Sequence, residues 1–128
     1  MKLRITGSSI RLRLSQSDVQ RFRESGLVEE VLSVGTGRDE AFSYSLRRSA
    51  ESGPISAALE SNRLIISMPA EEAADWTGTE RVGVTGSQAS ADGLEISILV
   101  EKDFACLTPR SGDEDIDSFP HPGQATNC

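Results

Sequence analysis

The side chains that most often perform chemistry are scarce in this sequence and gather in its last quarter. The chain has one histidine, His121, and two cysteines, Cys106 and Cys128. One imidazole and two thiolates, with an aspartate as fourth ligand, form a donor set that zinc accepts. Their spacing matches no zinc finger or ribbon and includes no CxxC pair. Three interpretations stay open: a zinc site, a redox role for the two thiols, or a structural role with Cys106 buried and Cys128 in a disordered tail.

The same segment offers little support for nucleophilic catalysis or calcium binding. His121 stands in a Pro-His-Pro sequence outside any expected element, whereas a catalytic base must be held within hydrogen-bond reach of its nucleophile by packed neighbours. The aspartates at 113, 115 and 117 have the spacing of an EF-hand loop. However, Ser118 and Gln124 replace the glycine and the closing glutamate of that loop, which leaves at most weak calcium binding. We therefore expect a protein that is not an enzyme and predict no cofactor, with zinc as the alternative.

A second group of candidate residues is a stripe of arginines near the beginning of the chain. Arg4, Arg11 and Arg13 alternate with apolar residues, so we expect them on the solvent face of one hairpin. This stripe is a solvated polar face, a surface covered by the acidic final segment, or a binding site for a small anion such as phosphate or a carboxylate. Arginines make bidentate contacts to such anions. No glycine-rich phosphate loop accompanies them.

Alternation of apolar and polar residues predicts that strands form most of the chain. Ser15, with Asp18 three residues later, marks the start of a short helix that Gly26 ends. A second short helix is expected from Ala70 to Trp76, after Pro69. Two runs around Gly7 form a hairpin, and further strands are expected at about 28–34, 41–48, 55–60, 63–68, 81–86 and 94–102.

The second half of the chain repeats the order of the first at an offset of 54 residues. We interpret this as a ββαββ unit used twice, over about 2–48 and 55–102, with a pseudo-twofold relating the units. The alternative is chance, since amphipathic strands always align in some register and the halves share almost no identical residues. The aligned positions are Ile10, Leu12 and Leu14 with Leu64, Ile66 and Met68; Val19 and Phe22 with Ala73 and Trp76; Val28 with Val82; and Phe42, Tyr44 and Leu46 with Ile96, Ile98 and Val100.

The expected fold class is α+β, mostly antiparallel β with two short helices, as a barrel or a two-sheet sandwich. A homodimer that shares a strand edge is the alternative to closure within one chain. We expect one domain over residues 1–104. Residues 105–128 are expected to form an acidic tail containing proline and glycine, with Phe119 as its contact to the domain.

Composition excludes several classes of partner. A chain of 128 residues can bury a core without metal or disulfides. The net charge of −7, with four Phe, one Tyr and one Trp, argues against binding to nucleic acid or an anionic membrane. No apolar run approaches the roughly 20 residues that span a bilayer, and the beginning lacks the apolar region of a secretory signal. We therefore expect a cytoplasmic protein without nucleic-acid or membrane partners.

The sequence also resembles a small family of uncharacterised bacterial proteins. The resemblance lies in Glu101-Lys102-Asp103-Phe104 with Cys106-Leu107, followed by an acidic run and Phe119-Pro120-x-Pro122. The Ile-x-Leu-x-Leu pattern of the first hairpin and the region of Trp76 belong to the same resemblance, which covers most of the chain. The family is a domain of unknown function, so the resemblance implies a bacterial cytosolic origin but no reaction, ligand or site.

The function is therefore unknown from the sequence, and three hypotheses follow. The first is a non-catalytic binding or interaction module with an unknown protein partner, which forms a homodimer in one version. The second is a zinc-binding or redox-linked protein that uses Cys106, His121 and Cys128. The third is a binder of small anions at Arg4, Arg11 and Arg13.

Overall fold

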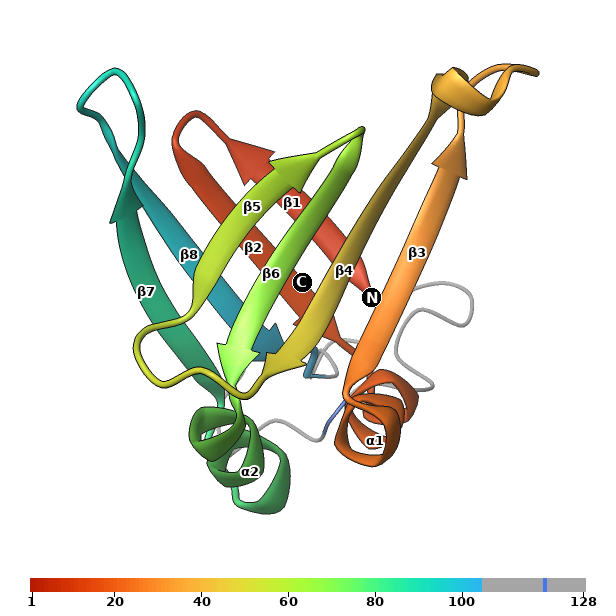
Figure 1. Ribbon diagram of the computed structural model, residues 1–128. Coiled ribbons are helices and arrows are strands. Elements are labelled where there is room, and N and C mark those ends of the chain that lie inside the picture. Colours follow the sequence, from red (N-terminus) through yellow and green to blue (C-terminus); the bar gives the residue numbers. More distant parts are fainter. Residues whose placement is uncertain (105–118, 120–128) are drawn as a thin grey trace.

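The computed structural model describes residues 1–104 and residue 119 (Figure 1). The strands and helices lie within a few residues of their predicted positions, and α2 includes Gly78, where the sequence predicted its end. The tail predicted for 105–128 lies outside the described residues except for Phe119. In chain order the elements are β1 (Lys2–Thr6), β2 (Ser9–Leu14), α1 (Gln16–Ser25), β3 (Leu27–Ser33), the 3-10 turn η1 (Arg38–Glu40), β4 (Ala41–Ser49), β5 (Ser56–Glu60), β6 (Arg63–Pro69), α2 (Ala70–Gly78), β7 (Gly83–Ala89) and β8 (Glu95–Lys102).

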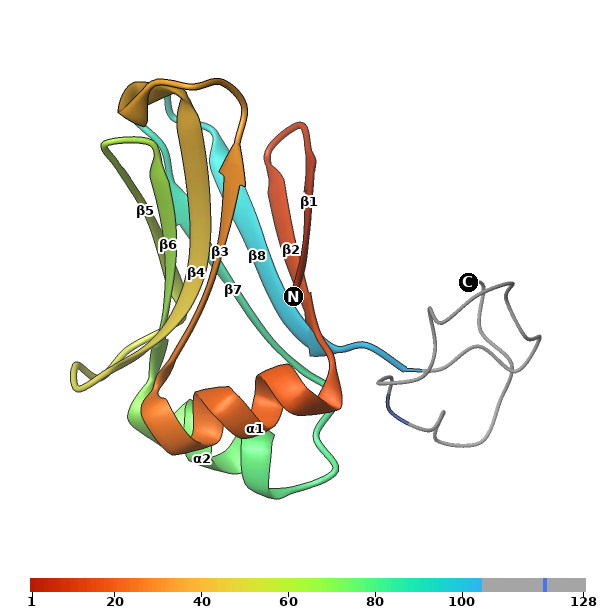
Figure 2. The ribbon, with the colours of Figure 1, turned by 90° about the vertical axis from the view of Figure 1, so that its right-hand side faces the viewer.

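The strands form two four-stranded sheets that face each other, and both helices lie at one end of them (Figure 2). The strand orders are β1-β2-β8-β7 and β3-β4-β6-β5. The hairpin pairs are antiparallel as predicted, but each sheet is mixed, because β2 pairs with β8 and β4 pairs with β6 in parallel. Each central pair joins strands from different halves of the chain. Alternation in the sequence marks such strands but does not reveal which of them are neighbours.

The two parallel pairs have equivalent registers. Ile10 lies opposite Ile98 in one pair, and Leu64 lies opposite Tyr44 in the other. Residue 64 follows residue 10 by 54 positions, and residue 98 follows residue 44 by the same 54 positions. In β7 the displacement is 56, because Val84, rather than the predicted Val82, corresponds to Val28. The cause is the longer connection between α2 and β7, which spans residues 79–82.

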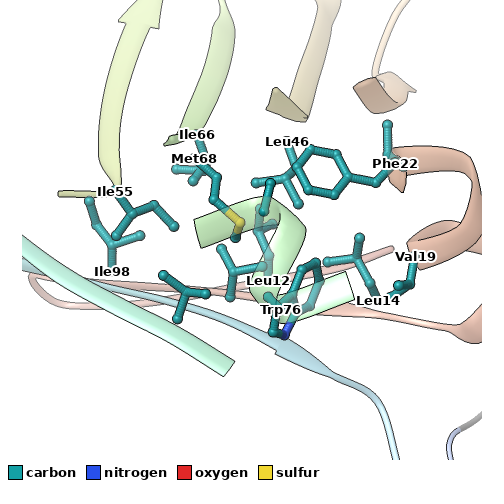
Figure 3. Packing of buried hydrophobic residues seen from close by; sticks show 14 of the residues in the cluster. Leu12, Leu14, Val19, Phe22, Leu46, Ile55, Ile66, Met68, Trp76 and Ile98 are labelled. Atoms are coloured by element: carbon teal, nitrogen blue, oxygen red, sulfur yellow. The ribbon is translucent and has the colours of Figure 1, made fainter. Parts of the chain in front are cut away.

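One hydrophobic core fills the space between the sheets and the helices (Figure 3). Leu12, Ile66 and Ile98, which alternation placed inside, are 0%, 0% and 2% exposed, and Phe42 packs against the core from a partly buried position. The core therefore draws on both sheets and both helices. Its buried members are Leu12, Leu14, Val19, Phe22, Val28, Leu46, Ile55, Leu64, Ile66, Met68, Ala73, Trp76, Val84, Ile98 and Val100.

The caps predicted for α1 are confirmed. Ser15 and Asp18 form a capping box, and Gly26 ends the helix in the left-handed conformation with φ 76°. Both helices are too short to be stable alone in water, so their position depends on the side chains that they bury against the sheets. Within the described part of the chain, no helix has the length and apolar character needed to cross a membrane.

No backbone ladder joins the two sheets within residues 1–104, so the predicted barrel alternative is wrong. Where β5 and β7 meet, a side chain makes the connection instead. The amide nitrogen of Gln88 donates to the carbonyl of Ala57, and the N–H of Ala57 donates to the side-chain oxygen of Gln88, both over 2.8 Å. A Cβ at Gly86 would lie 2.9 Å from the carbonyl oxygen of Ile55, so glycine permits this close approach. The carboxamide of Gln88 thus replaces the rung that a neighbouring strand would form.

Replacing Gln88 by leucine is expected to lower the free energy of unfolding by about 1–3 kcal/mol, because the N–H and C=O of Ala57 then lose their partners in a partly buried place. Urea denaturation followed by circular dichroism measures this change. Gln20→Leu is the matched control, since Gln20 is exposed on α1 and bonds only Glu24; its effect should stay within about 0.5 kcal/mol. Equal stability of both variants would contradict the role of the carboxamide.

Candidate functional site

The structure brings the three predicted arginines onto the outer face of one sheet. Arg4 on β1 lies directly opposite Arg11 on β2, and Arg13 follows two residues later on the same strand. Alternate residues of a strand share a face. The basic stripe therefore exists as a surface, as alternation in the sequence indicated.

One carboxylate from β8, that of Glu101, already contacts two of these arginines. Arg11 Nε donates to Glu101 Oε1 over 2.7 Å, and Arg13 Nε lies 3.1 Å from the same oxygen. Parallel pairing of β2 with β8 places Glu101 directly beside Arg13. Sequence reasoning missed this partner, because the position of Glu101 depends on which strand lies next to β2.

Asp103 continues this network of charges. Its Oδ2 lies 3.0 Å from Lys2 Nζ, and its Oδ1 lies 3.9 Å from Arg13 Nε. The residue is only 5% exposed, so the lysine and arginine offset a buried negative charge. Among the described residues, Arg4 alone of the three arginines has no carboxylate within ion-pair distance. The small-anion site stays a prediction, and Arg4 is the residue on which it would now mainly depend.

The predicted metal or redox residues Cys106, His121 and Cys128 lie outside the described residues. Within residues 1–104 and residue 119, no group of three or more His, Cys, Asp or Glu side chains could hold a metal ion. The zinc and redox hypotheses therefore stay predictions.

Phe119 contacts the domain, which confirms its predicted role. Its N–H donates to the carbonyl of Asp103 over 2.7 Å, and its ring meets that of Phe104 edge to face, with 5.9 Å between centroids. Lys102 Nζ lies 5.5 Å from the centroid of the Phe119 ring and donates to the carbonyl of Thr79 over 2.7 Å. Burial lowers the pKa of the Lys102 ammonium, although Glu80 acts in the opposite direction. These contacts join β8 to the connection after α2.

An apolar hollow opens between the two sheets at the end opposite the helices. Its volume is about 250 Å³, and its lining includes the turn of the β1–β2 hairpin. Figure 1 shows this turn at the end of the molecule away from α1 and α2. We call the hollow the apolar mouth. Its lining consists of Gly7, Ser8 and Ser9 from that turn and the side chains of Ile5, Ile10, Phe42, Leu59, Leu64 and Ile96.

The six large side chains of the apolar mouth come in three pairs at corresponding positions of the two halves. The pairs are 54 residues apart in the sequence: Ile5 with Leu59, Ile10 with Leu64, and Phe42 with Ile96. Each half of the chain therefore contributes three apolar side chains to one hollow.

The rim of the apolar mouth is exposed although it is apolar. Ile5 is 57% exposed and Leu59 is 70% exposed, whereas Leu64 deeper in the hollow is 8% exposed. Outside the hollow, Leu32, which pairs with Phe42, and Val34, just after β3, are also exposed apolar residues. Sequence reasoning assigned such alternating apolar residues to the core. The available signal in the sequence was only that alternation continues up to the turn in both hairpins.

Comparison with known proteins adds a family but no activity. A protein-family model described as "Family of unknown function (DUF7009)" matches residues 1–123. The comparison with curated proteins and the comparison with solved structures gave no match.

Proposed function

The chain belongs to this family, whose description assigns no function, and on that premise we propose that it is a non-catalytic interaction module whose apolar mouth receives one apolar side chain of a protein partner. The observation that carries the proposal is the pairing of large apolar residues at an exposed rim. Full burial of such a side chain contributes roughly 1.5–3 kcal/mol, a contribution that the exposed residues do not make to folding. Contact with a partner would bury them.

The size of the apolar mouth supports a protein side chain as its occupant. Sites for drug-sized molecules usually enclose about 300–1,000 Å³ and place a few polar groups to orient the ligand. Here the volume is about 250 Å³, and apart from the short turn the lining is apolar. Leu32 and Val34, outside the hollow, are further exposed apolar residues. Exposed apolar patches of this kind mark interaction sites, and a side chain buried in a pocket at the centre of an interface often contributes most of the binding free energy.

We also propose that the two halves are a duplicated ββαββ unit and that the apolar mouth lies where they meet. The equivalent registers of the two parallel pairs support this proposal. At the opposite end, the corresponding residues Phe22 and Trp76 pack against each other with 6.1 Å between ring centroids. A cytoplasmic location and a homodimer stay predictions.

Apolar side-chain analogues test the proposed site. N-acetyl-phenylalaninamide and N-acetyl-leucinamide are expected to shift the backbone NMR signals of Ile10, Leu64 and Ile96 in a saturable manner. Leu59→Lys should weaken this binding at least about tenfold, because it places a charge at the rim. Since Leu59 is exposed, the melting temperature should change little.

The control for this variant is Leu27→Lys, which changes an exposed leucine at the helix end of β3 and should leave binding unchanged. Absence of saturable shifts in the wild type, or equal binding by Leu59→Lys, would refute the site. Sedimentation at several protein concentrations tests the other candidate occupant, a second copy of this chain. A dimer that Leu59→Lys abolishes would identify a second copy of this chain in the apolar mouth and would overturn the proposal of a different partner.

A further inference from the structure

Corresponding strand edges on the two sides of the sandwich differ in their hydrogen bonding. On one side of the sandwich, Gln88 of β7 bonds both backbone groups of Ala57 on β5. On the other side, the corresponding positions hold Leu32 on β3 and Leu3 on β1. The correspondence follows from the registers, which place Ala57 opposite Ile66, Leu3 opposite Leu12, Gln88 opposite Ile96 and Leu32 opposite Phe42.

The backbone of Leu3 points out of the sheet edge. In an antiparallel hairpin, alternate residues turn their N–H and C=O toward the partner strand and away from it. Ala57 turns these groups away from β6, toward Gln88. Leu3 has the same position relative to its own hairpin turn. Its N–H and C=O therefore lie along the free edge of β1, where the side chain of Leu32 has no polar group to bond them.

Among residues 1–104 and residue 119, no strand pairs with the outer edge of β1. β5 and β7 contact each other more extensively than β1 and β3 do, and Figure 1 shows β1 and β3 diverging toward the end of the apolar mouth. Leu32 is 57% exposed, as expected for a side chain without a neighbour across the gap. A free strand edge of this kind is a template for pairing with another strand.

We propose that the free edge of β1 accepts an added strand from the protein partner. Along one face of β1, Leu3 and Ile5 would lie beside apolar residues of the added strand. Along the other face, Arg4 would lie beside an acidic residue of the added strand, since oppositely charged neighbours stabilise adjacent strands. Arg4 has no carboxylate within ion-pair distance among the described residues, so it is available for this contact. The partner segment is thus extended and alternates apolar with acidic side chains.

This inference deepens the proposed function, on which it rests, because the apolar residue next to Ile5 is the one placed to enter the apolar mouth. Strand addition of this type obtains affinity from main-chain hydrogen bonds and specificity from pockets for alternate side chains. The edge of β1 supplies the hydrogen bonds, and the apolar mouth supplies the pocket.

A capped, fluorescein-labelled heptapeptide of alternating valine and glutamate tests the edge by fluorescence anisotropy. Leu3→Pro removes the N–H that points out of this edge but no bond to β2, so it is expected to weaken peptide binding at least about tenfold. Leu3→Ile, which keeps this N–H, should bind like the wild type. Arg4→Glu should weaken binding by a similar factor, whereas Arg47→Glu on the other sheet should not.

Backbone pairing is tested separately. The bound peptide should slow hydrogen exchange of the Leu3 or Ile5 amide, and a peptide N-methylated at alternate residues should not bind. If the heptapeptide fails to bind, or binds without slowing exchange on β1, strand addition is wrong. When phenylalanine and leucine amides still bind the apolar mouth in that case, the proposed function survives. Conversely, slowed exchange on β1 without any binding of those amides would refute the apolar mouth and leave the edge.

Discussion

Replacing Trp76 by alanine is expected to lower the free energy of unfolding by about 3–5 kcal/mol, the usual result of truncating a buried tryptophan. Trp76 is 0% exposed, and its Nε1 donates to the carbonyl of Val82 over 3.0 Å. Its ring meets Phe22 of α1 edge to face. Loss of the ring would leave a cavity between the helices and the sheets and would free the backbone that leads into β7.

Urea denaturation followed by far-ultraviolet circular dichroism measures this effect, because the variant lacks the only tryptophan of the chain. Trp76→Phe serves as the control. It retains an aromatic ring beside Phe22 but loses the hydrogen bond to Val82, so we expect a smaller decrease, about 1–2 kcal/mol. If Trp76→Ala unfolds at the same urea concentration as the wild type, the described core is wrong.

The strands and helices were predictable because their signals are local. Alternation from Leu3 to Leu14 requires only that one face of the hairpin be buried, and Ser15 and Gly26 bond backbone groups within one or two helical turns. The offset of 54 residues is also found between the registers of the two parallel pairs. Pattern alone failed at β7. A net shift of two residues after α2 makes Val84, instead of Val82, correspond to Val28 and leaves the alternation unchanged.

The partners of the arginines could not be predicted because they depend on strand order. Glu101 neutralises Arg11 and Arg13 only if β8 lies beside β2. In the sequence these residues are far apart, and an isolated glutamate at the end of a strand has the same pattern whichever strand is adjacent. The charged face was therefore predictable, whereas its neutralisation was not.

The apolar mouth could not be predicted from the sequence for a related reason. Ile5 and Leu12 both occupy inward positions of the first hairpin, but Leu12 is 0% exposed and Ile5 is 57% exposed. The difference arises because both helices cover the same end of the sandwich (Figure 2). Alternation indicates which face of a strand points inward. Which end of that face is covered depends on the placement of the helices, which alternation does not predict.

The second large effect is expected at Asp18, a buried carboxylate at the start of α1. Asp18 is 6% exposed, and its Oδ2 lies 2.7 Å from the amino group of Met1 and accepts hydrogen bonds from the backbone and hydroxyl of Ser15. Burial by itself raises the pKa of Asp18. The Met1 ammonium and the hydrogen bonds from Ser15 outweigh burial, so that the pKa lies below its ordinary value of 3.8.

Asp18→Ala is expected to lower the free energy of unfolding at pH 7 by about 3–5 kcal/mol, because it removes one half of the capping box with Ser15 and leaves the buried Met1 ammonium with only Glu30 Oε1, 3.5 Å away. Because folding depresses the pKa, the unfolded chain binds more protons than the folded chain at acid pH. The stabilisation by Asp18 is therefore complete above the ordinary pKa of 3.8 and is lost as pH falls through the lower folded value. The difference between wild type and Asp18→Ala should shrink accordingly.

Urea titrations between neutral pH and about pH 3 follow this difference across the ordinary pKa range of carboxylates. Glu24→Gln, an exposed change on the same helix, should alter stability by less than about 0.5 kcal/mol at every pH. Asp18→Asn separates charge from shape. It preserves the side-chain oxygen that caps the helix but not the charge, so it should fall between wild type and Asp18→Ala at pH 7. A difference between wild type and Asp18→Ala that stays constant down to pH 3 would mean that the carboxylate contributes through packing alone.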